Sequence, residues 1–186
     1  MSEEEVRLAR PSPRFKAAFV ELMDDFAVAG DLRYEALRRR VETDFDAVVR
    51  EWKLAENGRN LQSGMSPYKT YWLLRNGRDI LGTIRLRLRL TDSLRIEGGH
   101  IGYNIRPSER NKGYATRMLA LGLEKFREMD SYERVLVTCD DDNFASARVI
   151  EKNGGVRDSD TVSPYSGKRV RRYWIELAPP ERPRSA

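Results

Sequence analysis

Cysteine and histidine are nearly absent from this sequence of 186 residues, which contains one of each, Cys139 and His100. A single cysteine forbids an internal disulfide and is typical of a reducing compartment, so we expect a cytoplasmic protein. Because Cys139 ends an apolar stretch, we interpret it as a small buried side chain and not as an acyl carrier. With no cysteine cluster, we expect neither a structural zinc site nor another metal.

Long apolar runs are also absent, and none approaches the length of a membrane span. The N-terminal segment MSEEEVRLAR lacks the apolar centre of a secretory signal, so we expect no membrane association. The net charge of +5 suits an anionic cofactor, an acidic acceptor or RNA. It does not choose among them, because basic residues are spread along the chain.

Hydrophobic periodicity divides the chain near residue 67. Apolar residues at helical spacing predict a helix over residues 14–29, a helical segment over 32–40, and a third helix that Thr43 caps and that ends near Gly58. Strand-like runs dominate the rest of the chain. We expect strands at residues 6–9, 69–75, 80–90, 100–105, 134–139, 156–162 and 170–177, and helices at 113–129 and 143–154.

The run from Ile84 to Leu90 alternates apolar residues with arginine. One face of this strand is therefore buried, and the other carries Arg85, Arg87 and Arg89. The arginine face could bind an acidic ligand or nucleic acid. We favour the alternative, a solvated sheet face covered by long side chains.

A strand over residues 100–105 leads through Pro107 into a basic loop that opens directly into a helix. The first backbone N–H groups of a helix have no internal partner, and the helix dipole adds positive charge there. Arg110 and Lys112 add further charge, and Gly113 lets a phosphate approach the backbone. The stretch lacks the Lys-Ser/Thr pair of a P-loop and the three glycines of a dinucleotide loop. It predicts a site for a phosphorylated ligand, the alternative being an ordinary strand-to-helix turn.

Arg110-x-x-Gly113-x-Ala115 resembles the pyrophosphate loop of the GNAT acetyltransferase superfamily, and NFASARVIEKNGG (143–155) resembles its second sequence block. The resemblance covers residues 67–177. It implies an α/β (α+β) fold, with a mixed, mostly antiparallel twisted sheet, flanking helices, a V-shaped cofactor cleft and an N-terminal helical section. We expect a single domain over 1–178, mostly helical over 1–66 with its core over 67–178, and a flexible tail over 179–186.

The resemblance also implies acetyl-CoA as cosubstrate and transfer of its acetyl group to a primary amine of a small molecule or peptide, by an enzyme that could form a homodimer. Backbone groups near the end of the strand would pair with the pantetheine arm, and loop N–H groups would hold the pyrophosphate. The implied cofactor-binding residues are Ile105, Arg106, Arg110, Asn111, Lys112, Gly113, Tyr114, Ala115, Thr116 and Asn143. For Asn143 the alternative is an ordinary helix N-cap.

Direct attack of an amine on a thioester needs a base, a donor for the developing oxyanion and an acid for the thiolate. Many relatives use a tyrosine of the second block as the acid, but the matching residue here is Ile150. We expect Glu97 or His100 as the base, with a solvated carboxylate and a structural histidine as the respective alternatives. Three tyrosines qualify as the acid by residue type, namely Tyr103, Tyr114 and Tyr165.

Two functions of other classes stay open. A coenzyme A-binding module without catalysis is consistent with isoleucine at position 150 and with the lack of an obvious acid and base pair. A nucleic-acid-associated protein is consistent with the basic charge and the arginine face. We rank it last because the sequence shows no RNA-recognition aromatic motif.

Overall fold

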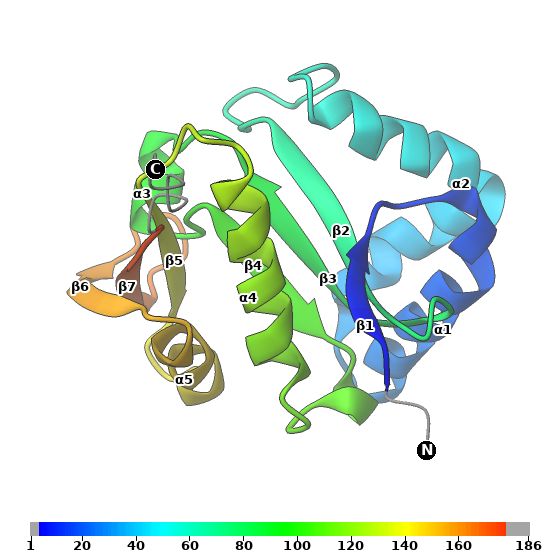
Figure 1. Ribbon diagram of the computed structural model, residues 1–186. Coiled ribbons are helices and arrows are strands. Elements are labelled where there is room, and N and C mark those ends of the chain that lie inside the picture. The colour runs from blue at the N-terminus through cyan, green and yellow to red at the C-terminus, as the bar shows by residue number, and fades with distance from the viewer. Residues whose placement is uncertain (1–3, 178–186) are drawn as a thin grey trace, which may run out of the picture.

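The strand-like runs after residue 67, together with one strand near the N-terminus, form one seven-stranded sheet. The computed structural model describes residues 4–177, so the expected tail at 179–186 lies outside the described residues. The strand order is β1-β2-β3-β4-β5-β7-β6, and only the β4–β5 pair is parallel (Figure 1). The strands are β1 (Val6–Ala9), β2 (Tyr68–Arg75), β3 (Asp79–Arg87), β4 (Ile101–Ile105), β5 (Arg134–Asp140), β6 (Val156–Val162) and β7 (Arg169–Glu176).

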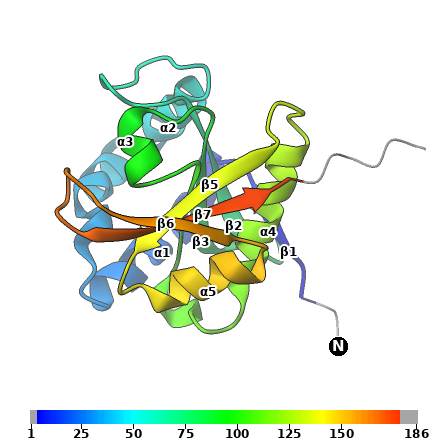
Figure 2. The ribbon, with the colours of Figure 1, turned by 90° about the vertical axis from the view of Figure 1, so that its left-hand side faces the viewer.

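Helices cover both faces of this sheet, as Figure 1 shows. They are α1 (Lys16–Val28), α2 (Glu35–Ala55), α3 (Asp92–Ile96), α4 (Tyr114–Arg127) and α5 (Phe144–Lys152). The helices α1 and α2 lie on one face and α4 on the other. In the side view, α5 runs along β5, β6 and β7 (Figure 2). No helix within residues 4–177 combines the length and the apolar character that crossing a membrane requires.

The two faces of the sheet carry separate apolar cores. Successive residues of a strand point to opposite faces, so Tyr71 and Leu73 of β2 belong to the core that contains α4. Trp72 and Leu74 belong to the core that α1 and α2 complete. Because both of its faces are buried, the centre of β2, residues 71–74, is a continuous apolar run without alternation.

The helix boundary predicted at Thr43 is wrong. The segments before and after it form one helix, α2, with a kink at Asp44 (φ −151°, ψ 86°). The hydroxyl of Thr43 donates back to the carbonyl of Arg39 at 2.8 Å, whereas Oδ1 of Asp44 accepts from the N–H of Ala47 at 2.8 Å. Asp44, and not the expected Thr43, therefore caps the second segment of α2.

The strands β4 and β5 part soon after they meet. They pair at a single position, Ile101 with Val137. Two bonds fasten the start of β4, from the N–H of Gly98 to Thr138 Oγ1 at 2.8 Å and from the N–H of His100 to Leu136 O at 2.7 Å. Beyond this point the sheet opens toward the start of α4, so one edge of β4 faces no strand.

Candidate active site

A cavity of about 230 Å³ lies in the opening between β4 and β5, and we call it the gap cavity. Its lining includes Gly102 and Tyr103 of β4, Thr138 and Cys139 of β5, and Ser146 of α5. It is the structural counterpart of the cleft that the sequence resemblance implies.

The backbone of β4 presents polar groups to this gap. The N–H of Arg87 donates to His100 O at 2.7 Å, and the N–H of Arg106 donates to Leu81 O at 2.9 Å. Even-numbered residues of β4 therefore use their backbone groups on β3, and alternation turns those of Tyr103 and Ile105 toward the gap. Such an edge can accept an extended chain as if it were a further strand.

Arg106 does not have the predicted role. Its N–H is bonded to β3, its carbonyl accepts from the N–H of Glu109 at 3.0 Å, and its Nε donates to Asp25 Oδ2 at 2.6 Å. Burial alone would raise the pKa of Asp25, but hydrogen bonds from Ser108 and Arg106 outweigh that effect and lower it. Arg106 therefore fastens the loop before α4 to α1. The backbone of Tyr103, and not that of Arg106, lies beside Ile105 at the open edge of β4.

The loop before α4 exposes backbone N–H groups. Gly113 is the N-cap of α4 with a left-handed φ of +83°, no side chain caps the helix, and Asn111 is also left-handed with φ +62°. A Cβ at Gly113 would have no heavy atom within 4 Å, so the space in front of the loop is open. The N–H groups of Tyr114, Ala115 and Thr116 begin the helix without intrahelical partners, which suits an anion.

The charged side chains of this loop are bonded to the protein instead. Lys112 pairs with Glu109 at 2.8 Å, and Nε of Arg110 donates to the carbonyl of Ile105 at 3.3 Å. The hydroxyl of Tyr114 donates to a carboxylate oxygen of Glu4 at 2.8 Å, away from the gap cavity. The loop therefore presents backbone N–H groups to an anion, while its charged side chains are bonded to the protein.

Asn143 and Tyr103 meet at the first turn of α5. Asn143 is the N-cap, and its Oδ1 accepts from the N–H of Ser146 at 3.0 Å, while its side chain also lines the gap cavity. The hydroxyl of Tyr103 lies 2.9 Å from Ser146 Oγ, so the phenol reaches from β4 across to α5. Burial raises the pKa of Tyr103 to about 12 and that of Cys139 to about 11. Cys139 is buried, as expected, and its thiol stays protonated at neutral pH.

His100 is a structural residue. Only 7% of it is exposed, its Nδ1 accepts from the N–H of Leu136 at 2.8 Å, and its ring packs edge-on against Phe126 and Tyr132. Burial lowers the pKa of His100 to about 4. Its side chain lines neither the gap cavity nor the larger cavity described below, which contradicts the predicted role as base.

Glu97 lies at the end of α3. Its Oε2 accepts from the hydroxyl of Ser166 in the loop between β6 and β7 at 2.8 Å. The next residue, Gly98, lines the gap cavity, but Glu97 itself does not. A catalytic role for Glu97 stays a prediction.

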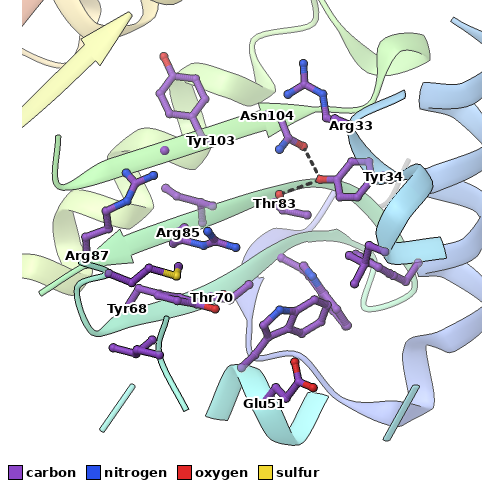
Figure 3. Close-up of a pocket in the computed structure, with 18 of the residues that line it drawn as sticks. Arg33, Tyr34, Glu51, Tyr68, Thr70, Thr83, Arg85, Arg87, Tyr103 and Asn104 are labelled. Carbon is purple, nitrogen blue, oxygen red and sulfur yellow. Dashed lines mark hydrogen bonds between the residues drawn. The ribbon is translucent and has the colours of Figure 1, made fainter. Parts of the chain in front are cut away.

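A larger cavity of about 610 Å³ lies between the sheet and the α2 side of the molecule. It is lined by β2, β3, β4, α2 and the loop at residues 60–65, and its lining shares Arg87, Gly102 and Tyr103 with the gap cavity. Figure 3 shows one wall, where the hydroxyl of Tyr34 donates to Asn104 Oδ1 at 3.1 Å and lies 3.2 Å from Thr83 Oγ1. This wall was not predicted from the sequence. The signal that could have predicted it is the presence of polar residues, Thr83 and Asn104, within apolar strands.

The arginine face of β3 belongs largely to this cavity. Arg85 lies over the ring of Tyr68 at 4.3 Å, and Nη1 of Arg87 donates to the carbonyls of Gly98 and Gly99 at 2.9 and 3.2 Å. Both arginines line the larger cavity, and Arg89 does not. The interpretation as a solvated face is therefore wrong for two of the three arginines.

Comparison with known proteins extends this description. The family model described as "Acetyltransferase (GNAT) domain" matches residues 7–156. No curated protein sequence matches the chain.

Solved structures with similar folds include three acetyltransferases. Mycobacterium smegmatis RimJ in complex with CoA-disulfide has a TM-score of 0.68 at 17% identity, over 92% of this chain and 81% of that one. Microcin C7 self immunity acetyltransferase MccE, in complex with acetyl-CoA and AMP, has a TM-score of 0.67 at 12% identity, over 92% of both chains. A chimera of the Vibrio cholerae spermidine N-acetyltransferase SpeG with hSSAT has a TM-score of 0.63 at 13% identity, over 93% and 96%. The mixed, mostly antiparallel fold predicted from the sequence is confirmed.

Proposed function

The chain belongs to the GNAT acetyltransferase domain family, and on that premise we propose that it transfers the acetyl group of acetyl-CoA to a primary amine. The observation that carries the proposal is the open edge of β4 beside the uncapped start of α4. The complexes of MccE with acetyl-CoA and of RimJ with CoA-disulfide support the choice of cosubstrate. The single cysteine supports a cytoplasmic location.

The residues of the open edge and of the loop before α4 suit coenzyme A by their chemistry. The backbone groups of Tyr103 and Ile105 would pair with the amide groups of the pantetheine arm. The N–H groups of residues 111–116 would hold the pyrophosphate, because Gly113 leaves the approach open and no side chain caps the helix. Asn143 lines the gap cavity beside them while it caps α5.

Acetyl-CoA supplies an activated thioester, and the chain's own groups position it and move the protons. In the proposed reaction the amine nitrogen bonds to the acetyl carbon, the carbon–sulfur bond breaks, and the amine loses a proton. The hydroxyl of Tyr103 gives a proton to the departing sulfur, and its raised pKa keeps it protonated at neutral pH. A backbone N–H of Tyr103 or Ile105 donates to the carbonyl oxygen as negative charge develops there.

The acceptor would enter through the larger cavity. This cavity meets the gap cavity at Arg87, Gly102 and Tyr103, so an amine in it would reach the thioester at the open edge of β4. Glu97 stays a prediction for the base, either directly or through water. Two arginines of the basic face line this cavity, which supports a small ligand over nucleic acid as their partner.

The experiment measures release of free coenzyme A over a panel of primary amines, together with calorimetric binding of acetyl-CoA. Acetyl-CoA-dependent release with an amine, accompanied by an acetylated product in the mass spectrum, is the expected result. Tight binding without turnover on any amine would instead favour the non-catalytic binding module. Absence of binding would contradict both.

A further inference from the structure

The larger cavity carries more positive than negative charge. Its charged lining residues are Arg33, Arg40, Arg85, Arg87 and Glu51. Arg33 pairs with Asp31 outside the lining at 2.6 Å, and Arg40 pairs with Glu51 at 2.5 Å. Within residues 4–177 no ion pair joins Arg85 or Arg87 to a carboxylate, so these two guanidinium groups supply the net charge of the cavity.

Arg85 and Arg87 are held beside one another. They lie two residues apart on the same face of β3, which separates their Cα atoms by about 7 Å. The ring of Tyr68 supports Arg85, and two backbone carbonyls hold one nitrogen of Arg87. A Cβ at Gly102 would lie 3.4 Å from Nη1 and Nη2 of Arg87, so a larger residue there would crowd this guanidinium.

Bringing two like charges into a partly buried site is unfavourable unless an anion neutralises them. The pKa of Arg87 shows this cost, because burial and the neighbouring Arg85 lower it to about 10. Arginine presents several N–H donors in a fixed geometry that matches carboxylate and phosphate oxygens. The pair is therefore arranged for an oxyanion.

Unpaired donors in the same cavity are a second and independent observation. The hydroxyl of Thr70 and Nε1 of Trp72 are buried, with 7% and 0% of the residues exposed, and neither has a hydrogen-bond partner within the described residues 4–177. Buried polar groups in proteins are almost always paired. Both residues line the larger cavity, and Thr70 stands directly across from Arg85 in the β2–β3 register. The unpaired hydroxyl of Thr70, across from Arg85, therefore marks this part of the wall as a place for a ligand oxygen.

We propose that the larger cavity binds a small-molecule amine that also carries a carboxylate or phosphate group, which Arg85 and Arg87 hold together with Thr70. The inference rests on the proposed function for the fate of the amine. A volume of about 610 Å³ suits a small ligand. With its anion on the arginine pair, the ligand directs its amine toward Tyr103, where the larger cavity meets the gap cavity.

Matched pairs of acceptors test the proposal. The amines are γ-aminobutyrate with butylamine, phosphoethanolamine with ethanolamine, phenylalanine with phenylalaninamide, and spermidine as the polycation. The measurement is kcat/KM from coenzyme A release. We expect at least one anionic member to exceed its partner and spermidine by about tenfold or more, because charged hydrogen bonds have that strength. Comparison of the γ-aminobutyrate pair with the phosphoethanolamine pair also shows whether the site prefers a carboxylate or a phosphate.

Variants of the arginine face locate the effect. Arg85→Met should lower kcat/KM for the preferred anionic amine by about 10- to 100-fold, chiefly through KM, and leave the neutral partner within about threefold. Arg85→Lys should restore part of the loss, and Arg85→Glu should reverse the preference toward spermidine. Arg89→Met is the matched control, because Arg89 lies on the same basic stretch but outside the cavity, and it should behave as the wild type.

Calorimetry separates failure of the inference from failure of the proposed function. Inorganic phosphate and γ-aminobutyrate are titrated into the wild-type chain and into Arg85→Met, whose circular dichroism checks the fold. If the wild type binds these anions and Arg85→Met binds them more weakly, the anion site is supported even when no turnover is seen. In that case only the proposed acetyl transfer is contradicted. Two results would overturn the inference while the transferase activity stands. One is acetyl transfer without any preference for anionic amines, and the other is equal affinity of Arg85→Met and Arg89→Met for the titrated anions.

Discussion

Substitution of Gly113 by glutamate places a carboxylate in front of the N–H groups that are proposed to hold the pyrophosphate. The added side chain fits, because a Cβ at Gly113 meets nothing within 4 Å. Its left-handed φ of +83° disfavours any residue with a side chain, by about 1–2 kcal/mol. The fold should therefore survive with a modest loss of stability.

The loss of acetyl-CoA affinity should be larger than the loss of stability. Two unit charges about 4 Å apart repel by about 1 kcal/mol in water and by about 4 kcal/mol near a protein surface. Since every 1.4 kcal/mol is about tenfold in Kd, Gly113→Glu should weaken binding by about 5- to 700-fold. Gly113→Ala, which adds backbone strain without charge, should weaken it much less.

Calorimetric titration with acetyl-CoA measures these affinities, and urea denaturation measures the stability. Gly64→Glu is the matched control, because its φ is +81° and a Cβ there also meets nothing within 4 Å. Gly64 lies in the loop before β2 and not in the loop before α4. It should lose the same stability and keep its affinity. Equal affinities for the two glutamate variants would refute the placement of the pyrophosphate.

Three further predictions follow from single contacts. Tyr103→Phe removes the proposed proton donor and should lower kcat by about 100-fold with unchanged acetyl-CoA affinity; a kcat within twofold of wild type would remove Tyr103 from the mechanism. Asp25→Ala leaves Arg106 without its carboxylate and should cost about 1–3 kcal/mol in urea unfolding together with affinity for acetyl-CoA, and unchanged affinity would show that the clamp does not shape the loop. The pKa of His100 is about 4 in the folded chain and about 6.5 unfolded, so the unfolded chain binds the extra proton and stability should fall by about 3 kcal/mol as the pH drops from 6.5 to 4. His100→Asn keeps an acceptor for the N–H of Leu136 and should reduce the dependence of stability on pH. An unchanged dependence would show that carboxylates, and not His100, cause it.

Much of the fold could be predicted because its signals are local. The helical and strand-like periods marked most elements to within a few residues, and the two sequence blocks marked the loop before α4 and the start of α5. The N-cap role of Asn143 was also readable, since its partner, the N–H of Ser146, is three residues away. The family prediction is confirmed by the model that matches residues 7–156.

The side-chain roles depend on partners that are distant in the sequence. Arg106 bonds Asp25, 81 residues earlier, and Asn104 bonds Tyr34, 70 residues earlier. No local pattern predicts such pairs, so the sequence did not show that Arg106 is held by β3 and α1, and not at the cofactor edge. The same holds for the basic face of β3, because only the packed structure shows that α2 and the loop at 60–65 turn two of its arginines into a cavity wall.

Amide hydrogen exchange followed by NMR tests the central claim most directly, namely that acetyl-CoA lies along the open edge of β4 and over the start of α4. On addition of acetyl-CoA, exchange should slow at the N–H groups of Tyr103 and Ile105 and at residues 111–116. The edge strand β6 at Val156–Val162 serves as the internal reference and should not change. Protection that misses both Tyr103 and the loop at 111–116, or that appears on β6 instead, would contradict the account.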